Sequence, residues 1–207
     1  MTTPDTPDET IARKQALADV VRRLVESTAL ADAASTDPAD LEAVTADLAA
    51  AADRMAAWPS LHATGLAMAP GLQGTLLERS GIAGRSNPLA APVQWETGPD
   101  GVTRGHAVFG PAYEGPPGCV HGGFVAAAFD DLLGSAQTAS GSAGYTGTLT
   151  VRMIRPTPLG KRIDYEAAVD RVEGRKIHVW GTADCGGERL AEAGIVFIAP
   201  ADGMYRR

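Results

Sequence analysis

One long apolar helical segment followed by four strand-like segments constrains the fold of this chain more than any other feature. Residues 121–138 are apolar over a helical length, and the three alanines at 126–128 favour a helix. The segments 146–155, 162–172, 176–184 and 190–198 alternate between polar and apolar residues, and turn sequences separate them. Three consecutive turns of this kind predict an antiparallel meander. A sheet with one apolar face can bury the single helix.

Two further strands are expected before the helix. Residues 93–97 and 102–109 are strand-like, and the sequence Gly-Pro-Asp-Gly at 98–101 predicts a turn between them. The order of elements is therefore two strands, one long helix and four strands. This order predicts the α+β class, with a single antiparallel sheet that covers the helix.

The first ninety residues have a different pattern. Apolar residues close to a 3.6-residue period predict an amphipathic helix over 8–34, and Asp37 before Pro38 predicts the start of a second helix over 38–57. Residues 58–92 are rich in Pro and Gly and predict an irregular connection, long enough to cover or border a site. We divide the chain into an N-terminal helical extension (1–60), an irregular connection (61–91) and a folded domain (92–207). A packing appendage is favoured for the two helices over a partner-binding helical hairpin.

Charge and composition limit the classes of partner. The net charge is −7, and residues 1–60 hold eleven acids and five bases, a net charge of −6. An acidic chain without a basic face is a poor ligand for duplex nucleic acid, because the phosphates dominate that affinity, whereas a nucleotide needs only a few placed cations. No apolar run is long enough for a membrane span and no signal-peptide pattern begins the chain, so we expect a cytoplasmic protein.

The two cysteines, Cys119 and Cys185, lie far apart in the sequence and have no histidine at ligand spacing. They predict neither a zinc site nor a disulfide framework, and we expect no metal and no cofactor. Small, buried, apolar side chains are the ordinary role of such cysteines.

The junction between a Gly- and Pro-rich loop and the long helix carries the residues suited to chemistry. Gly122 and Gly123 at a helix start leave backbone N–H groups uncovered beside the positive end of the helix dipole, where they can stabilise an oxyanion. Asp130 and Asp131 follow on the same apolar helix, where an acid is unfavourable unless it is paired or functional. Their side chains point about 100° apart, so one of them is expected to face solvent or a subunit partner, and spacing does not say which. His121 could serve only as the cap of the helix.

In this junction and in the strand after it, the sequence resembles the hotdog-fold acyl-CoA thioesterases. The resemblance lies in the sequence GPPGCVHGG at 115–123, in Asp130 nine residues after His121, and in Thr146 nine residues before Arg155. It covers roughly residues 90–200 and is nearest to the branch with the phenylacetate-pathway (PaaI-like) enzymes and the human thioesterase-superfamily-member proteins. It implies a hotdog fold, in which an antiparallel sheet wraps around one central helix. It also implies a homodimer or dimer of dimers with its sites at the subunit interface.

The resemblance assigns a role to each matching residue. Asp130 matches the helix carboxylate that acts as general base or nucleophile, and Thr146 matches the hydroxyl residue that positions water across the dimer interface. Gly122 and Gly123 match the helix-start amides that polarise the thioester carbonyl, with His121 ordering that turn. The implied reaction hydrolyses a fatty or aromatic acyl-CoA to the free acid and CoA, with no metal. Many PaaI-like members have an asparagine upstream of His-Gly-Gly, where this chain has Gly-Pro-Pro, so the threonine arrangement would have to substitute for it.

Other residues and functions are left open at this point. Asp131 could share or compete for the role of Asp130. Cations that could bind the CoA phosphates, or else only protect edge strands against aggregation, are Arg152, Arg155, Lys161, Arg162, Arg175 and Lys176. A non-catalytic acyl-CoA-binding protein with the N-terminal helices as an interaction arm is one alternative function, and a hotdog enoyl-CoA hydratase or dehydratase is another.

Overall fold

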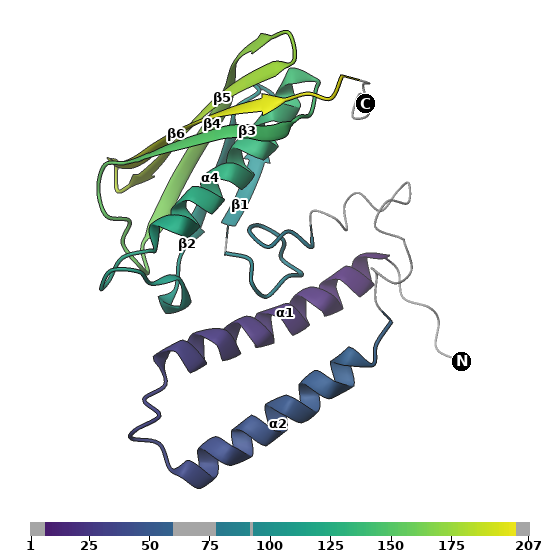
Figure 1. Cartoon of the computed structure of the whole chain (residues 1–207), viewed down its shortest axis with the longest axis vertical. Helices are drawn as coiled ribbons and strands as arrows, with labels where there is room; N and C mark the ends of the chain where they lie inside the picture. The colour runs from purple at the N-terminus through teal and green to yellow at the C-terminus, as the bar shows by residue number, and fades with distance from the viewer. Residues whose placement is uncertain (1–6, 60–77, 92, 202–207) are drawn as a thin grey trace.

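The computed structural model describes residues 7–59, 78–91 and 93–201 (Figure 1). In chain order the helices and strands are α1 (Pro7–Leu30), α2 (Pro38–Ala56), β1 (Val93–Thr97), β2 (Thr103–Val108), the 3-10 helix η2 (Pro111–Tyr113), α4 (Gly122–Ala136), the 3-10 helix η3 (Gln137–Ser140), β3 (Tyr145–Met153), β4 (Arg162–Glu173), β5 (Lys176–Cys185) and β6 (Glu188–Ile198).

The six strands form one antiparallel sheet in the order β1-β2-β4-β5-β6-β3, and this sheet curls around α4 (Figure 1). Side chains alternate along β5 between buried positions that face α4 and more exposed positions on the outer face. The core between the two layers is apolar, and its largest side chains, none more than 2% exposed, include Phe109, Phe129, Leu132, Leu133, Ile163, Ile177 and Ile195. The predicted α+β class with one central helix is confirmed.

The predicted four-strand meander is wrong for its first strand. β4, β5 and β6 are consecutive neighbours, but β3 pairs with β6 at the edge of the sheet and not with β4. Arg155 N–H still donates to Leu190 O of β6 at 3.0 Å, but two residues later Thr157 O accepts from Val120 N–H of the loop before α4 at 2.8 Å, so the chain has left the sheet. Pro156 and Pro158 lack the N–H that a continuous ladder needs, and Gly160 N–H donates to Phe109 O at 2.9 Å, just after β2.

Segment 78–91, here called the strap, connects α1 to the domain. It consists of turns, and residues 60–77 of the predicted irregular connection lie outside the described residues. Ala18 of α1 is 3% exposed, and Gln15 Nε2 donates to Glu78 Oε2 at 2.9 Å. The guanidinium of Arg22 donates to two backbone carbonyls of the strap at 3.2 and 3.3 Å. Helix α1 therefore packs on the strap through one face.

Helix α2 starts where the sequence predicts. The carboxylate of Asp37 accepts from Ala39 N–H at 2.9 Å, and Pro38 occupies the first turn, where its missing N–H has no cost. No residue of α2 is buried.

Cys119 and Cys185 are both free and half-buried, so the expectation that they are buried is wrong. Cys119 lies in the loop before α4, and Cys185 ends β5 next to a glycine turn, so both positions are at the rim of the core. Among the helices that the structure describes, none is long and apolar enough to cross a membrane.

Candidate active site

The loop before α4 has a defined shape. His121 N–H donates to Tyr113 O at 2.8 Å, and Val120 N–H donates to Thr157 O at 2.8 Å. Gly115 lies directly against the cap of the helix, since a Cβ at this position would come within 2.7 Å of His121 Cα. The close approach requires glycine at this position, and the loop fixes the place where α4 begins.

His121 is the N-cap of α4. Its backbone is extended (φ −60°, ψ 132°), and its Nδ1 accepts a hydrogen bond from Gly123 N–H at 3.0 Å. The N–H groups of Phe124 and Val125 donate to His121 O at 2.9 and 3.3 Å. Among the described residues, Gly122 N–H is then the one donor of this turn without an acceptor. Of the two backbone N–H groups predicted to bind an oxyanion, that of Gly122 is free, whereas that of Gly123 donates to the side chain of the N-cap residue His121.

Asp130 lies on the exposed side of α4 and contacts β3. Its Oδ1 accepts a hydrogen bond from Thr146 Oγ1 at 3.0 Å. Leu149 and Val151 face the core, so strict alternation would turn Thr146 to the outer face of the sheet. The register of β3 shifts between Thr146 and Thr148, and this bulge turns Thr146 toward α4. The family resemblance singled out both residues, and Gly147, which lies inside the strand between Thr146 and Thr148, is a local signal for the bulge.

Asp131 is bound to protein donors on the other side of α4. One carboxylate oxygen accepts from Trp95 Nε1 at 3.0 Å, and the other accepts from Ser80 Oγ at 3.3 Å. Burial raises the pKa of this carboxyl, and the charge of Asp130 adds to the rise, while both hydrogen bonds oppose it. The sequence did not single out Trp95 or Ser80, because no local pattern connects them to the helix.

A single protomer does not bring all candidate residues together. Gly122 and Asp130 are eight residues apart on one straight helix, which separates them by about 12 Å along its axis. A water molecule held by Asp130 and Thr146 could therefore not attack a carbonyl bound at Gly122 of the same chain.

The candidate cations lie at two ends of the sheet. Arg152 and Arg155 lie at the end of β3 that is close to the start of α4. The Cε atom of Met153, the last residue of β3, is 3.7 Å from the position that a Cβ on Gly122 would occupy. Arg175 and Lys176 lie at the β4–β5 turn, on the side of the sheet where β3 begins. Several of these cations bind the protein itself: Arg152 pairs with Glu192 at 3.4 Å, Arg155 Nη1 donates to Arg189 O at 2.8 Å, Arg162 pairs with Asp164 at 2.8 Å, and Arg175 Nε donates to Ala199 O at 2.7 Å.

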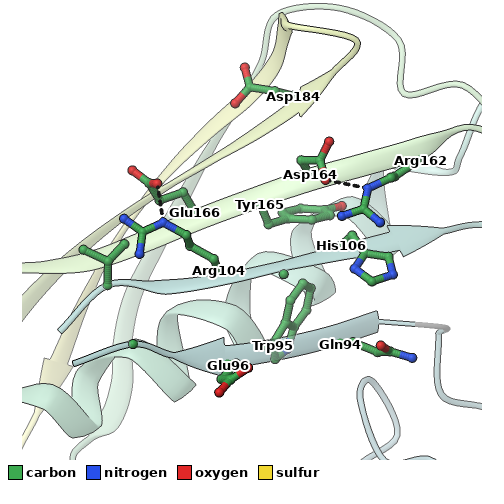
Figure 2. A pocket seen from close by; sticks show the side chains of 13 residues that line it. Gln94, Trp95, Glu96, Arg104, His106, Arg162, Asp164, Tyr165, Glu166 and Asp184 are labelled. Atoms are coloured by element: carbon green, nitrogen blue, oxygen red, sulfur yellow. Dashed lines mark hydrogen bonds and ion pairs between the residues drawn. The ribbon is translucent and has the colours of Figure 1, made fainter. Parts of the chain in front are cut away.

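A wide hollow of about 760 Å³ lies elsewhere, on the outer face of β1, β2 and β4 (Figure 2). Arg104 pairs there with Glu166 at 3.0 Å, and Arg162 pairs with Asp164 at 2.8 Å. None of the residues around the start of α4, nor Asp130 or Thr146, lines it. Both arginines that line the hollow are paired with carboxylates of the sheet, so we assign the candidate site to α4 and β3 and not to this hollow.

Comparison with known proteins identifies the class to which this geometry belongs. No family model matches the chain. The acyl-coenzyme A thioesterase THEM4 of Xenopus laevis is 38% identical over 68 residues, 33% of this chain and 31% of that protein. The match thus spans about a third of the length of the curated relative.

Two solved structures extend the likeness to the fold. A thioesterase superfamily protein is 29% identical with a TM-score of 0.78, covering 96% of this chain and 94% of that chain. A hypothetical thioesterase of Streptococcus pneumoniae, solved with coenzyme A, is 14% identical with a TM-score of 0.50, covering 56% of this chain and 90% of that chain, and shows the fold alone. The chain has a hotdog fold. Its expected resemblance to the thioesterase superfamily is confirmed.

Proposed function

We propose that this protein hydrolyses acyl-CoA thioesters at two equivalent sites of a homodimer. The observation that carries the proposal is the hydrogen bond of 3.0 Å between Thr146 and Asp130, on an exposed face of a helix whose first N–H group is free. A carboxylate beside a hydroxyl can hold and deprotonate water, and a free helix-start N–H can stabilise an oxyanion. The resemblance to thioesterases, and the coenzyme A in a protein of the same fold, support acyl-CoA as the substrate class.

The separation of the two halves of the site supports a second subunit. Asp130 and Gly122 of one chain are about 12 Å apart along the helix, so each complete site needs Gly122 from one protomer and Asp130 from its partner. β3 is an edge strand with exposed apolar side chains, among them Tyr145 at 62% and Met153 at 47% exposure. An uncovered edge of this kind is suited to pairing with the same strand of a second copy.

The proposed reaction has three steps. The thioester carbonyl binds with its oxygen at Gly122 N–H, and Thr146 and Asp130 of the partner protomer hold a water molecule beside the carbonyl carbon. Asp130 accepts a proton as the water oxygen bonds to this carbon, and the negative charge moves to the carbonyl oxygen. The carbon–sulfur bond then breaks, the carbonyl re-forms as the free acid, and the CoA sulfur leaves with the proton from Asp130.

A thiol-release assay across short, aromatic, medium and long acyl-CoAs tests the reaction class and the substrate together. Asp130→Asn should keep the fold, because this side chain is exposed in the protomer, and should lower kcat by about 100-fold or more if the residue is the general base. A folded Asp130→Asn variant with the parental rate would refute the assignment. Hydration of crotonyl-CoA, measured beside thiol release, separates hydrolysis from hydratase activity.

A further inference from the structure

Two adjacent carboxylates of α4 bind the two opposite edges of the sheet. In the strand order β1-β2-β4-β5-β6-β3, the edge strands are β1 and β3. Asp130 accepts from Thr146 of β3, and Asp131 accepts from Trp95 of β1. Because the sheet curls around the helix, both edges come within reach of side chains that point about 100° apart.

Asp131 is held from two sides by donors. Ser80 Oγ accepts from Ile82 N–H at 3.1 Å and from Ala83 N–H at 3.2 Å, so its hydrogen is free to point at the carboxylate of Asp131. Trp95 is fixed in turn, since its ring packs edge-on against Tyr165 with the ring centroids 5.3 Å apart. The position of Asp131 is therefore set by the strap and by β1 together.

Apart from the edge-on contact of Phe129 with Tyr165, with ring centroids 5.7 Å apart, the other inward contacts of α4 have less directional preference than the hydrogen bonds of Asp131. The buried side chains of this helix are all apolar, and apolar packing is non-directional: they are Val125, Ala128, Phe129, Leu132, Leu133 and Ala136. Hydrogen bonds have preferred directions, so the two contacts of Asp131 constrain the rotation of the turn that also carries Asp130.

We propose that Asp131 is a positioning residue for the hydrolysis: by binding Trp95 and Ser80 it fixes the rotation of α4 that brings Asp130 to Thr146. The inference rests on the proposed function. A carboxylate stands about 6 Å from the helix axis, so a rotation of about 10° moves it by about 1 Å. Because a misplacement of about 1 Å can cost about 100-fold in rate, the loss of both contacts should lower kcat by about 10- to 100-fold.

Three variants on the homodimer test this role against a matched control. Asp131→Ala removes both acceptors. Asp131→Asn keeps one acceptor oxygen and places an amide N–H group opposite the donor that the second oxygen had bound. Trp95→Phe removes the indole donor but keeps an aromatic ring against Tyr165. Asp131→Ala should lower kcat most, and Asp131→Asn and Trp95→Phe should lower it less. KM should change less than threefold in all three variants. Asp47→Asn, on exposed α2, should keep the parental kcat.

A double-mutant comparison separates positioning from a general loss of structure. If Asp131 acts through Asp130, its replacement should cost less than twofold in the Asp130→Asn background. Parental kcat in both Asp131→Asn and Trp95→Phe overturns the inference, and so does a loss that persists in full in the Asp130→Asn background. An inactive parental protein would count against the proposed function itself, whereas an active parent with a silent Asp131 leaves that function standing.

Discussion

Replacing Gly122 by proline is a direct test of the proposed oxyanion site, because it deletes the free N–H and retains the helix. Proline is favoured at the first position of a helix, and the residue before it needs an extended backbone. His121 already has this backbone, with ψ at 132°, and a Cβ at Gly122 would meet only Met153 Cε at 3.7 Å, an ordinary contact. The fold should therefore accept the change.

The expected loss follows from the number of donors. Gly122 N–H is the one free donor of this turn among the described residues, and removing one oxyanion donor costs about 100- to 1,000-fold in kcat. Gly122→Ala is the matched control, since it adds the Cβ but keeps the N–H. Alanine is also the better helix former by about 0.5–1 kcal/mol, so this variant should melt about 2 °C higher than the parent.

Thiol release under saturating acyl-CoA and a thermal melt are the two measurements. A proline variant that melts like the parent and turns over as fast as Gly122→Ala would refute the role of this N–H group.

Mixing two inactive variants extends the test to the subunit interface. Gly122→Pro and Asp130→Asn protomers, refolded together, should form about half heterodimers, each with one intact site. About a quarter of the parental activity should return, and none would return if each site lay within one chain.

Three further predictions concern stability. Phe129→Ala should lower the free energy of unfolding by about 3–5 kcal/mol in urea titrations, because this side chain is fully buried and its ring packs 5.7 Å from that of Tyr165. Burial raises the pKa of Asp131, so the stability from this group is present below about pH 4 and is lost as pH rises through the folded-state pKa. Asp131→Asn should therefore gain stability relative to the parent as pH rises above about 4, and a parallel pH dependence of the two proteins would contradict this. Ala18→Asp should free α1 from the strap and expose the strap to limited proteolysis, whereas Leu41→Asp on the exposed helix α2 should not.

The sequence predicted what depends on local periodicity and little of what depends on distant partners. The helix that became α4 and the six strands were all evident, because apolar period and turn residues are local. The pairing of β3 with β6 was not, because four alternating segments in a row look the same whether or not the first is a neighbour of the second. The spacing of Asp130 and Asp131 could not say which acid faces which strand, and only the family resemblance favoured Asp130, because the positions of Thr146 and Trp95 on opposite edges depend on the folded sheet.

Since one turn of α4 reaches both edges of the sheet, we expect insertions and deletions of a single residue in this helix to be poorly tolerated. A single residue gained or lost between Gly122 and Asp130 would rotate both acids by about 100° relative to the helix start and shift the proposed base by about 1.5 Å along the helix axis. The glycine turns at Gly174 and at Gly186 and Gly187, which lie far from this turn in the chain, carry no such constraint. Natural length variation and engineered insertions should therefore concentrate there.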